Sequence, residues 1–184
     1  MGSFFRYIDD GSALFRECLI VVQSRSYVPP YFEGIELKEV IFLARILDKA
    51  AVQPRRSFNL ATSFTIRRSP GRTRLATIRL RIPVSKSQPN RVELVATVGV
   101  RGVTGIAQIL FRIFRDGREI FNTLQGIEST GSEQNYVVTF QAIDRNVRSG
   151  THVYTVTAEN RTANTRADVV GPISFSGLAV QTSS

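Results

Sequence analysis

From residue 72 to the C-terminus the sequence repeats one pattern, in which apolar and polar side chains alternate over short segments between turn residues. Segment 73–83 shows it most simply, with apolar positions Ala76, Ile78, Leu80 and Ile82. Successive side chains of a β-strand point to opposite faces, so a period of two predicts a strand with one buried face. The pattern restricts this region to β-structure.

Similar segments follow along the chain. The predicted strands are 73–83, 91–100, 108–115, 118–121, 135–143, 151–159 and 173–181. In 91–100 the expected inward set is Val92, Leu94, Ala96, Val98 and Val100. Strand 135–143 carries apolar residues in both phases, so we expect both of its faces to be covered. Turns are predicted at 102–105 and 160–164, and Gly171-Pro172 is expected to open the last strand.

The most specific local signal is Asp116-Gly117, which separates two alternating apolar runs. A two-residue hairpin turn of type I′ needs positive φ angles, which Gly adopts readily and Asp tolerates. The dipeptide predicts a hairpin whose two strands lie in one sheet.

These segments predict an all-β fold, an antiparallel, jelly-roll-like β-sandwich of about eight strands with an extended basic N-terminal arm. A parallel sheet is disfavoured because crossover helices are missing from the pattern. The one helix candidate is 40–51, where Ile41, Ala44 and Leu47 share a face, and it is too short to be stable alone.

Three regions are expected from these patterns. Residues 1–42 have poor periodicity and form a poorly structured extension. Residues 43–71 form a basic arm with one candidate strand, 58–66, and residues 72–184 form the sandwich. With 42% hydrophobic residues, the chain is too apolar to be mainly disordered.

Positive charge is concentrated in the arm and the first strand. The chain has a net charge of +9, and between Lys49 and Arg91 it has eleven basic residues and no acidic one. The basic-arm residues are Arg55, Arg56, Arg67, Arg68, Arg72 and Arg74. Such an arm can bind phosphates or carboxylates. Aromatic residues are not interleaved with the arginines, which disfavours nucleic acid and favours a solvated arm that docks on acidic partner surfaces.

Cysteine content and hydropathy exclude several protein classes. The single Cys18 cannot form an internal disulfide, a thiolate zinc site or an iron–sulfur centre. No run approaches the roughly 20 apolar residues that span a bilayer, and run 18–22 lacks a signal-peptide cleavage site. We therefore expect no membrane association, and synthesis in a cytosol without a signal peptide.

The search for catalytic chemistry predicts no enzyme and no catalytic, cofactor-binding or metal residues. His152, the only histidine, lies in the middle of a predicted strand, and the glycines form no phosphate-binding loop. Asp116, Asp144 and Asp168 lie in a turn or at strand ends, and segment 144–146 has too few carboxylates for calcium. Asn160-Arg161-Thr162 matches the N-glycosylation pattern in a predicted surface turn.

Segments 90–99, 111–117 and 169–177 occur in the order found in a known family, and they resemble exosporium protein C of spore-forming Gram-positive bacteria. The resemblance covers residue 43 to the C-terminus. It implies a structural component of the endospore outer layer or of a spore appendage, made in the mother-cell cytoplasm, with no catalytic residues to carry over.

The first region departs from that family. Lys38-Glu39-Val40 is the translation of the bacterial ribosome-binding sequence AAGGAGGT, and Leu43 could derive from the start codon TTG. One hypothesis is that residues 1–42 are a translated upstream region. The alternative is a native extension that packs or docks.

Self-assembly is the expected mechanism. The arm residues Phe58, Leu60, Phe64 and Ile66 form a candidate donor strand that could pair with the open sheet edge of a neighbouring copy. The expected partners are copies of the chain and other spore-surface proteins. One alternative is a viral-type jelly-roll coat protein whose basic arm binds nucleic acid, and another is a carbohydrate-binding sandwich, which the absence of Trp disfavours.

Overall fold

The structure, a computed structural model, describes residues 45–84, 89–130 and 134–181. The regular secondary structure within these ranges consists of β-strands only. They are β1 (Arg45–Arg55), β2 (Phe64–Thr65), β3 (Thr73–Ile82), β4 (Asn90–Thr104), β5 (Ile106–Arg115), β6 (Arg118–Glu128), β7 (Asn135–Arg145), β8 (Gly150–Asn160) and β9 (Arg166–Gln181). The all-β prediction is confirmed.

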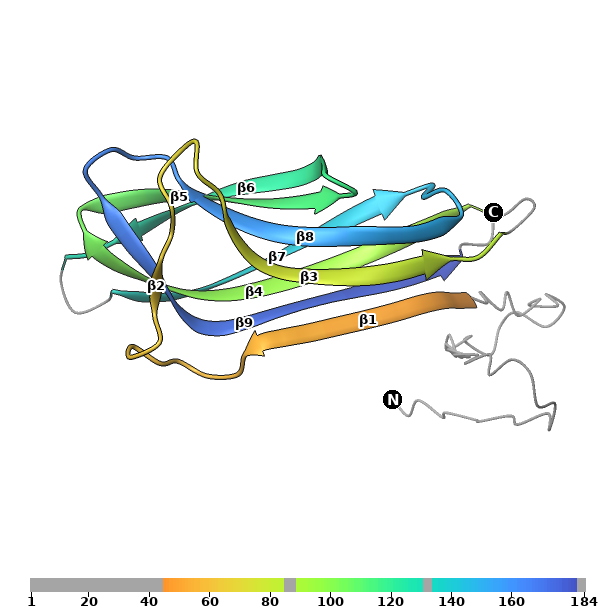
Figure 1. The fold of residues 1–184 in the computed structure, drawn as a ribbon, viewed down its shortest axis with the longest axis horizontal. Coiled ribbons are helices and arrows are strands. Elements are labelled where there is room, and N and C mark those ends of the chain that lie inside the picture. The colour runs from red at the N-terminus through yellow and green to blue at the C-terminus, as the bar shows by residue number, and fades with distance from the viewer. Residues whose placement is uncertain (1–44, 85–88, 131–133, 182–184) are drawn as a thin grey trace, which may run out of the picture.

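The strands form two antiparallel sheets that pack face to face (Figure 1). Sheet A has the order β1-β9-β4-β7, and the short strand β2 also pairs with β9. Sheet B has the order β3-β8-β5-β6. Each sheet buries one face against the other, which is the architecture of a β-sandwich.

The eight long strands pair in a nested order. The first pairs with the last, β1 with β9, and then β3 pairs with β8, β4 with β7 and β5 with β6. The chain is thus one long hairpin whose successive strand pairs alternate between the sheets, and the pairs β4–β9 and β5–β8 complete each sheet. This is a jelly roll, so the predicted fold class is confirmed.

The core lies between the sheets and consists of the side chains that the alternation places inward. The predicted inward residues of β3 and β4 are all buried: Ala76, Ile78, Leu80, Ile82, Val92, Leu94, Ala96, Val98 and Val100. Tyr154, Phe111 and Phe175 are the largest fully buried side chains. Burial of one such side chain contributes about 1.5–3 kcal/mol, so these inward faces hold the sheets together.

Gly177 in β9 allows the two sheets to approach closely. A Cβ atom at this position would lie 2.8 Å from the Cδ1 atoms of both Ile78 and Leu80 in β3, and real Cβ atoms essentially never come this close. A side chain here would require the side chains of Ile78 and Leu80 to shift. Glycine at this position therefore suits the close packing of the two sheets.

The turn between β5 and β6 has the predicted geometry. Asp116 and Gly117 have φ angles of 50° and 83°, as a type I′ hairpin requires, and both flanking strands lie in sheet B. Because the strand pairs are nested, this turn is the tip of the rolled hairpin.

The helix predicted over 40–51 is wrong from Arg45 onward, because this part of the segment begins β1; residues 40–44 lie outside the described residues. β1 pairs with the edge of β9, and Leu47, Ala50 and Val52 pack against the core. A short helix gains few hydrogen bonds by itself, whereas this strand gains a full ladder and covers apolar surface.

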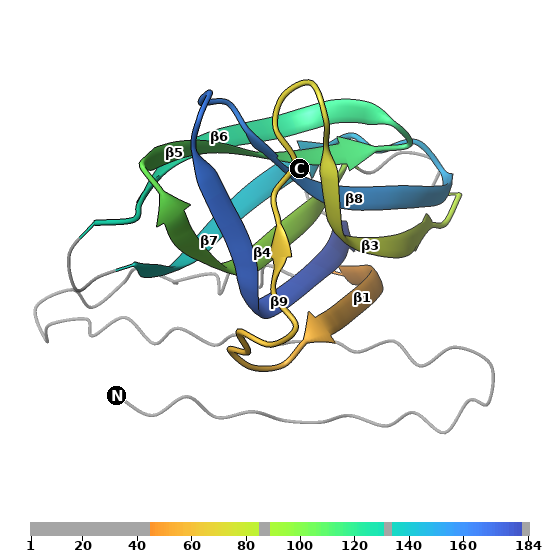
Figure 2. The same ribbon diagram turned by 60° about the vertical axis from the view of Figure 1, so that its left-hand side comes forward.

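The sandwich also includes most of the segment predicted as an arm. After β1, residues 56–72, here called the strap, cross one end of the sandwich from sheet A to sheet B (Figure 2). Phe64 pairs with Val169, and the backbone N–H of Ser69 donates to the carbonyl of Asn160 over 2.9 Å. The sandwich therefore contains Arg45–Arg55 and the strap, rather than beginning at residue 72.

Two strand predictions are corrected. The outward side of β7 is not covered within the described chain, since Val137 is 66% exposed and Ile143 is 49% exposed. The last strand begins at Arg166 rather than at residue 173, because β9 passes through a register shift near Gly171, whose φ is 85°. Glycine tolerates that conformation, so Gly171-Pro172 lies inside the strand.

Candidate assembly surfaces

The outer edge of β7 has the features of an open pairing site. β7 ends sheet A, and among the described strands it pairs only with β4. Its register with β4 runs from Asn135 to Arg145 without a bulge. Between them, residues 136–143 include no charged residue, proline or glycine. An edge strand with an uncharged middle and no bulge can present unpaired N–H and C=O groups to another strand.

The edges of β1 and β3, which lie together on the other side of the sandwich, are protected. Asp48 in β1 accepts a 2.6 Å hydrogen bond from the backbone N–H of Arg81 in β3, so this donor is not open to a foreign strand. Pro54 within β1 lacks an N–H, and Pro83 follows the end of β3. Exposed arginines on β3 add charge to the same edge.

The strap holds the four predicted assembly residues, and the sandwich of the same chain contacts them unequally. Ile66 is 2% exposed and belongs to the core, and Phe64 is half-buried under the guanidinium of Arg55, whose Cζ lies 4.9 Å from the ring centroid. Phe58 and Leu60 are about half exposed. Within one chain, β1 rather than segment 58–66 supplies the long edge strand beside β9.

The predicted basic-arm residues divide into two groups. Arg55 donates hydrogen bonds to the hydroxyl and carbonyl oxygens of Thr62, and the Cζ of Arg72 lies 5.1 Å from the centroid of the Phe114 ring. The other four are exposed and have no ion-pair partner among the described residues: Arg56, Arg67, Arg68 and Arg74. The strap therefore contributes positive charge that is not neutralised within the sandwich.

Glu159 is buried at the end of β8, and guanidinium groups surround it. Arg112 Nη1 lies 2.6 Å from its Oε2 and Arg161 Nη1 lies 3.1 Å from its Oε1, while Arg72 Nε lies 4.0 Å from Oε2. Burial raises the pKa of Glu159, but the Ser69 hydrogen bond and the two nearer arginines outweigh it and hold this pKa below its usual value. Local sequence patterns did not predict this cluster, because Arg72, Arg112 and Glu159 come from distant segments.

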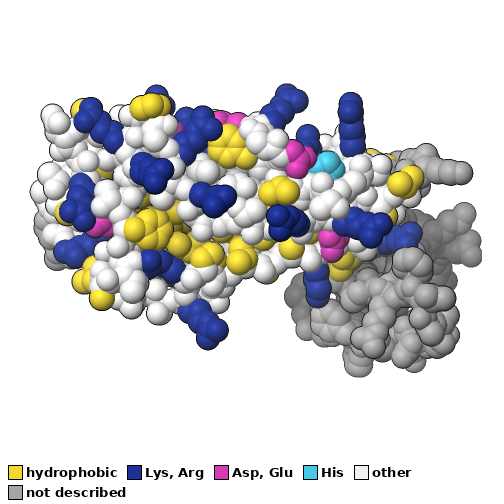
Figure 3. Space-filling model, viewed as in Figure 1, with side chains coloured by type: hydrophobic (Ala, Val, Ile, Leu, Met, Phe, Trp, Pro, Cys, Tyr) yellow, Lys and Arg dark blue, Asp and Glu magenta, His cyan; other side chains and the backbone are white. Residues whose placement is uncertain are grey.

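The outward side of sheet B, here called the cationic face, is rich in arginine. The β3 residues Arg74, Arg79 and Arg81 stand beside the β8 residues Thr157, Val153 and Thr151. No carboxylate on the neighbouring strand neutralises these arginines. Figure 3 shows many Lys and Arg and few Asp and Glu on the side where β1, β3 and β8 lie.

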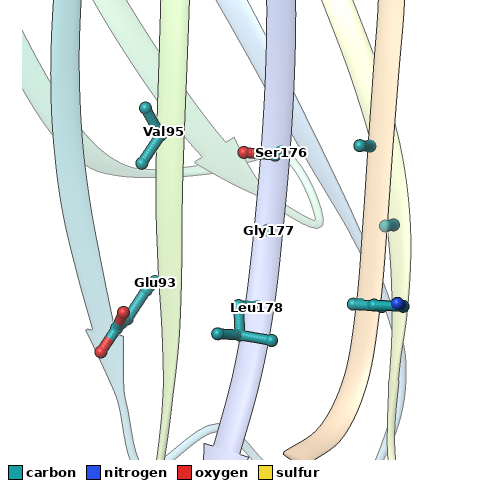
Figure 4. A pocket seen from close by; sticks show the side chains of 8 residues that line it. Glu93, Val95, Ser176, Gly177 and Leu178 are labelled. Atoms are coloured by element: carbon teal, nitrogen blue, oxygen red, sulfur yellow. The ribbon is translucent and has the colours of Figure 1, made fainter. Parts of the chain in front are cut away.

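The outward side of sheet A, here called the neutral face, is mostly uncharged in its middle. One row across β1, β9, β4 and β7 is Ala51, Ser176, Val95 and Gln141, and the next is Lys49, Leu178, Glu93 and Ile143. Residues from β1, β9 and β4 line a shallow hollow (Figure 4). Lys49 and Glu93 lie on opposite sides of Leu178, one on each neighbour of β9.

The only histidine anchors the hairpin turn. His152 Nδ1 lies 2.6 Å from Asp116 Oδ2, and its Nε2 lies 2.8 Å from the carbonyl oxygen of Arg148. Asp116 also accepts a hydrogen bond from the N–H of Val153. Burial raises the pKa of Asp116, but the hydrogen bonds from Val153 and His152 and the charge of Arg115 bring it below its usual value. These contacts tie the β5–β6 turn to β8.

A second polar network joins the two sheets. Arg115 Nη1 in β5 donates to both carboxylate oxygens of Asp144 in β7, over 2.9 and 2.7 Å, and the Tyr154 hydroxyl in β8 donates to the same carboxylate over 3.0 Å. Burial and the nearby Asp144 charge raise the pKa of Tyr154. Asp168, the third aspartate singled out in the sequence, pairs with Arg166 and accepts from the Thr65 hydroxyl.

Three further features bear on the sequence predictions. In the described ranges, no group of three or more His, Cys, Asp or Glu side chains could hold a metal ion, and no helix there is long and apolar enough to cross a membrane. Asn160 is 2% exposed, and its amide donates to the carbonyl and hydroxyl oxygens of Thr165. The expectation of an exposed Asn160 is wrong, because its side chain stabilises the turn before β9.

The sequence matches no protein-family model and no curated protein. The structure is similar to dimeric latent PorU from Porphyromonas gingivalis, with 8% identity over 73% of this chain and 13% of that chain and a TM-score of 0.45. It is also similar to the insecticidal delta-endotoxin Cry8Ea1 from Bacillus thuringiensis, with 13% identity over 66% of this chain and 19% of that one and a TM-score of 0.31. For the structure of infectious bursal disease virus Gt strain, the identity is 10% over 90% of this chain and 48% of that chain, with a TM-score of 0.41. This chain thus spans less than half the length of each.

Proposed function

We propose that this chain is a non-enzymatic structural subunit that assembles with copies of itself through its sheet edges. The outer edge of β7 from Val137 to Ile143 carries this proposal. This segment is uncharged and pairs with β4 without a bulge, whereas β6, the other edge on that side, carries Arg118, Glu119 and Glu128 and a register shift. Proteins protect the edges they do not use, so an unprotected edge indicates a partner strand.

Edge pairing extends sheet A of one molecule into the next. Main-chain hydrogen bonds supply the affinity, and side chains on alternate positions supply the register. Pairing of β7 with a different strand of the neighbour repeats without closing and builds a filament or layer, whereas pairing with its own copy gives a two-fold dimer.

The place of assembly that we propose is the surface of the bacterial endospore, in the exosporium layer or in a spore appendage. The resemblance of segments 90–99, 111–117 and 169–177 to exosporium protein C supports this location, with synthesis in the mother-cell cytoplasm. Other spore-surface proteins are then additional partners.

Two lysines on the β7 edge test the proposal. Thr139 and Gln141 are exposed on the outward side of β7. The double variant Thr139→Lys/Gln141→Lys places two like charges in the middle of the edge. We expect it to lose every assembly that depends on β7 pairing and to keep only those formed through other surfaces. Sedimentation velocity measures the loss, and circular dichroism checks that the sandwich stays folded. Unchanged assembly would contradict the proposal.

Two matched variants identify the partner strand. If β7 pairs with its own copy, Thr139→Glu/Gln141→Glu also blocks pairing, while Thr139→Lys/Gln141→Glu retains it because opposite charges meet. If the partner strand is a different, cationic one, the variant with two glutamates pairs and the variant with two lysines does not.

The cationic face favours a second candidate function, that of a coat protein which binds nucleic acid. Arg79 and Arg81 are exposed and have no ion-pair partner among the described residues. Binding of this kind releases counterions and weakens steeply with salt. RNA binding that falls with salt, and whose salt slope becomes shallower in Arg79→Ala/Arg81→Ala, would favour this function over the first.

A further inference from the structure

In its two middle rows the neutral face carries one cation and one anion, placed symmetrically about β9, and Arg91 lies one row beyond Glu93 on the same side of β4. Lys49 in β1 and Glu93 in β4 are both in register with Leu178, so each lies one strand spacing, about 4.8 Å, from β9. Lys49 is exposed and has no ion-pair partner in the described part of the chain. Glu93 accepts a 2.7 Å bond from Arg91 Nε on Oε1, which leaves its Oε2 for a further donor.

This symmetric placement allows two copies to pack with their neutral faces together, related by a two-fold axis that runs parallel to β9 between the two faces. Rotation about such an axis places β9 against β9 of the second copy and exchanges the two sides, so that β1 of one copy faces β4 of the other. Lys49 of each copy then faces Glu93 of the other, and Ala51 faces Val95. Leu178 meets its own counterpart on the axis.

We infer that the neutral face binds the same face of a second copy about this two-fold axis. The inference deepens the proposed self-assembly and rests on it for its biological meaning, but the contact uses residues other than the β7 edge. An isologous interface requires that each contact occurs twice, and the Lys49–Glu93 pair meets this requirement.

The charge of the molecule favours this face over the others. The described residues include nineteen Lys and Arg against eight Asp and Glu, so most approaches of two copies are repulsive. Two cationic faces would place arginines against arginines. The neutral face offers the small side chains of Ala51 and Ser176 beside a hollow, with its two flanking charges of opposite sign.

The face contact is compatible with β7 pairing. In the two-fold arrangement β7 lies on the β4 side of β9, one strand spacing beyond β1 of the second copy, and so stays outside the overlap. A molecule can then contact one neighbour through its face and another through its edge. Two distinct contacts per molecule continue into an open assembly unless their symmetry closes it.

Charge reversal tests the inference in the full chain that carries Thr139→Lys/Gln141→Lys, so that β7 pairing does not contribute. Lys49→Glu and Glu93→Lys each create two like-charge contacts in the dimer, and we expect each to weaken association about tenfold or more. An equimolar mixture of the two variants should associate as well as the parent, because one chain is then acidic and the other basic at both positions. Arg79→Glu on the cationic face is the control and should leave the dimer intact.

Sedimentation velocity distinguishes the outcomes. Association that is unchanged by either reversal, a mixture that fails to restore it, or a parent that is monomeric at its solubility limit would overturn the inference. Failure of the β7 proposal appears elsewhere, as full assembly in Thr139→Lys/Gln141→Lys, so the two failures are separable.

Discussion

The two outward faces of this sandwich are built from strands of the same kind and carry different surfaces. The cationic face presents Arg74, Arg79 and Arg81 beside neutral threonines, and the neutral face presents small residues such as Ala51 and Ser176. Side chains that point inward form the core and determine the fold. Side chains that point outward can therefore vary and determine which partners bind. The difference is the basis of our proposal that self-contact uses sheet A and leaves sheet B to solvent or anionic partners.

The faces also differ in how they hold a carboxylate. Glu159 on sheet B is 2% exposed between Arg112 and Arg161, whereas Glu93 on sheet A is partly exposed beside Arg91. A buried charge that loses its partner is costly, and an exposed ion pair contributes little. Glu159 is therefore expected to contribute more to stability than Glu93.

The largest predicted effect comes from neutralising these two carboxylates. Glu159→Gln removes the buried carboxylate nearest to Arg112, which is partly buried and keeps Glu119 at 3.2 Å, so we expect the free energy of unfolding to fall by about 2 kcal/mol. Glu93→Gln should lower it by less than about 1 kcal/mol. Urea denaturation followed by circular dichroism compares the two, and equal losses would remove this difference between the faces.

A smaller effect is expected when a charge is placed on each face. Leu178→Asp puts a carboxylate on the proposed two-fold axis and should weaken face-to-face association roughly thirtyfold, the effect of losing an interface hot spot. Thr155→Asp, on the cationic face, should leave association unchanged. Sedimentation equilibrium gives both constants. The same weakening in both variants would indicate a general charge effect.

The smallest predicted effect is a pH dependence of stability that arises from carboxylates held by sheet B. The pKa values of Glu159 and Asp116 are held below their usual values, so their contribution to stability is present above about pH 4 and is lost as pH falls through the folded-state values. Thermal unfolding can be followed from about pH 6 to about pH 3. The unfolding temperature should fall less steeply with pH in Glu159→Gln than in the parent. An identical fall in both would contradict the role given to Glu159.

Local patterns were sufficient to predict most of the strands after residue 72 and the central turn. The alternation around Leu80 and Leu94 identified β3 and β4 and their buried faces, and Asp116-Gly117 identified the hairpin. Such signals depend only on neighbouring residues in the chain. They also indicated a jelly roll, because short strands without crossover helices have few ways to pack.

The missed features depend on contacts between distant segments. β1 was predicted as a helix because Ala44 and Leu47 share a helical face, and its strand conformation comes from pairing with β9. The Arg72, Arg112 and Arg161 cluster around Glu159 and the placement of Lys49 opposite Glu93 also arise only after the sheets form. The β7 edge could have been suspected from the uncharged stretch 136–143, but its position at the end of a sheet could not.

Sedimentation velocity of the full, unmodified chain, freed of nucleic acid and compared at low and high salt, tests the central claim most directly. Edge pairing relies mainly on main-chain hydrogen bonds, which salt screens little, whereas salt weakens the Lys49–Glu93 contacts proposed for the neutral face. We predict species larger than the monomer at both salt concentrations. A monomer under both conditions, or assembly that appears only when nucleic acid is added, would contradict the account.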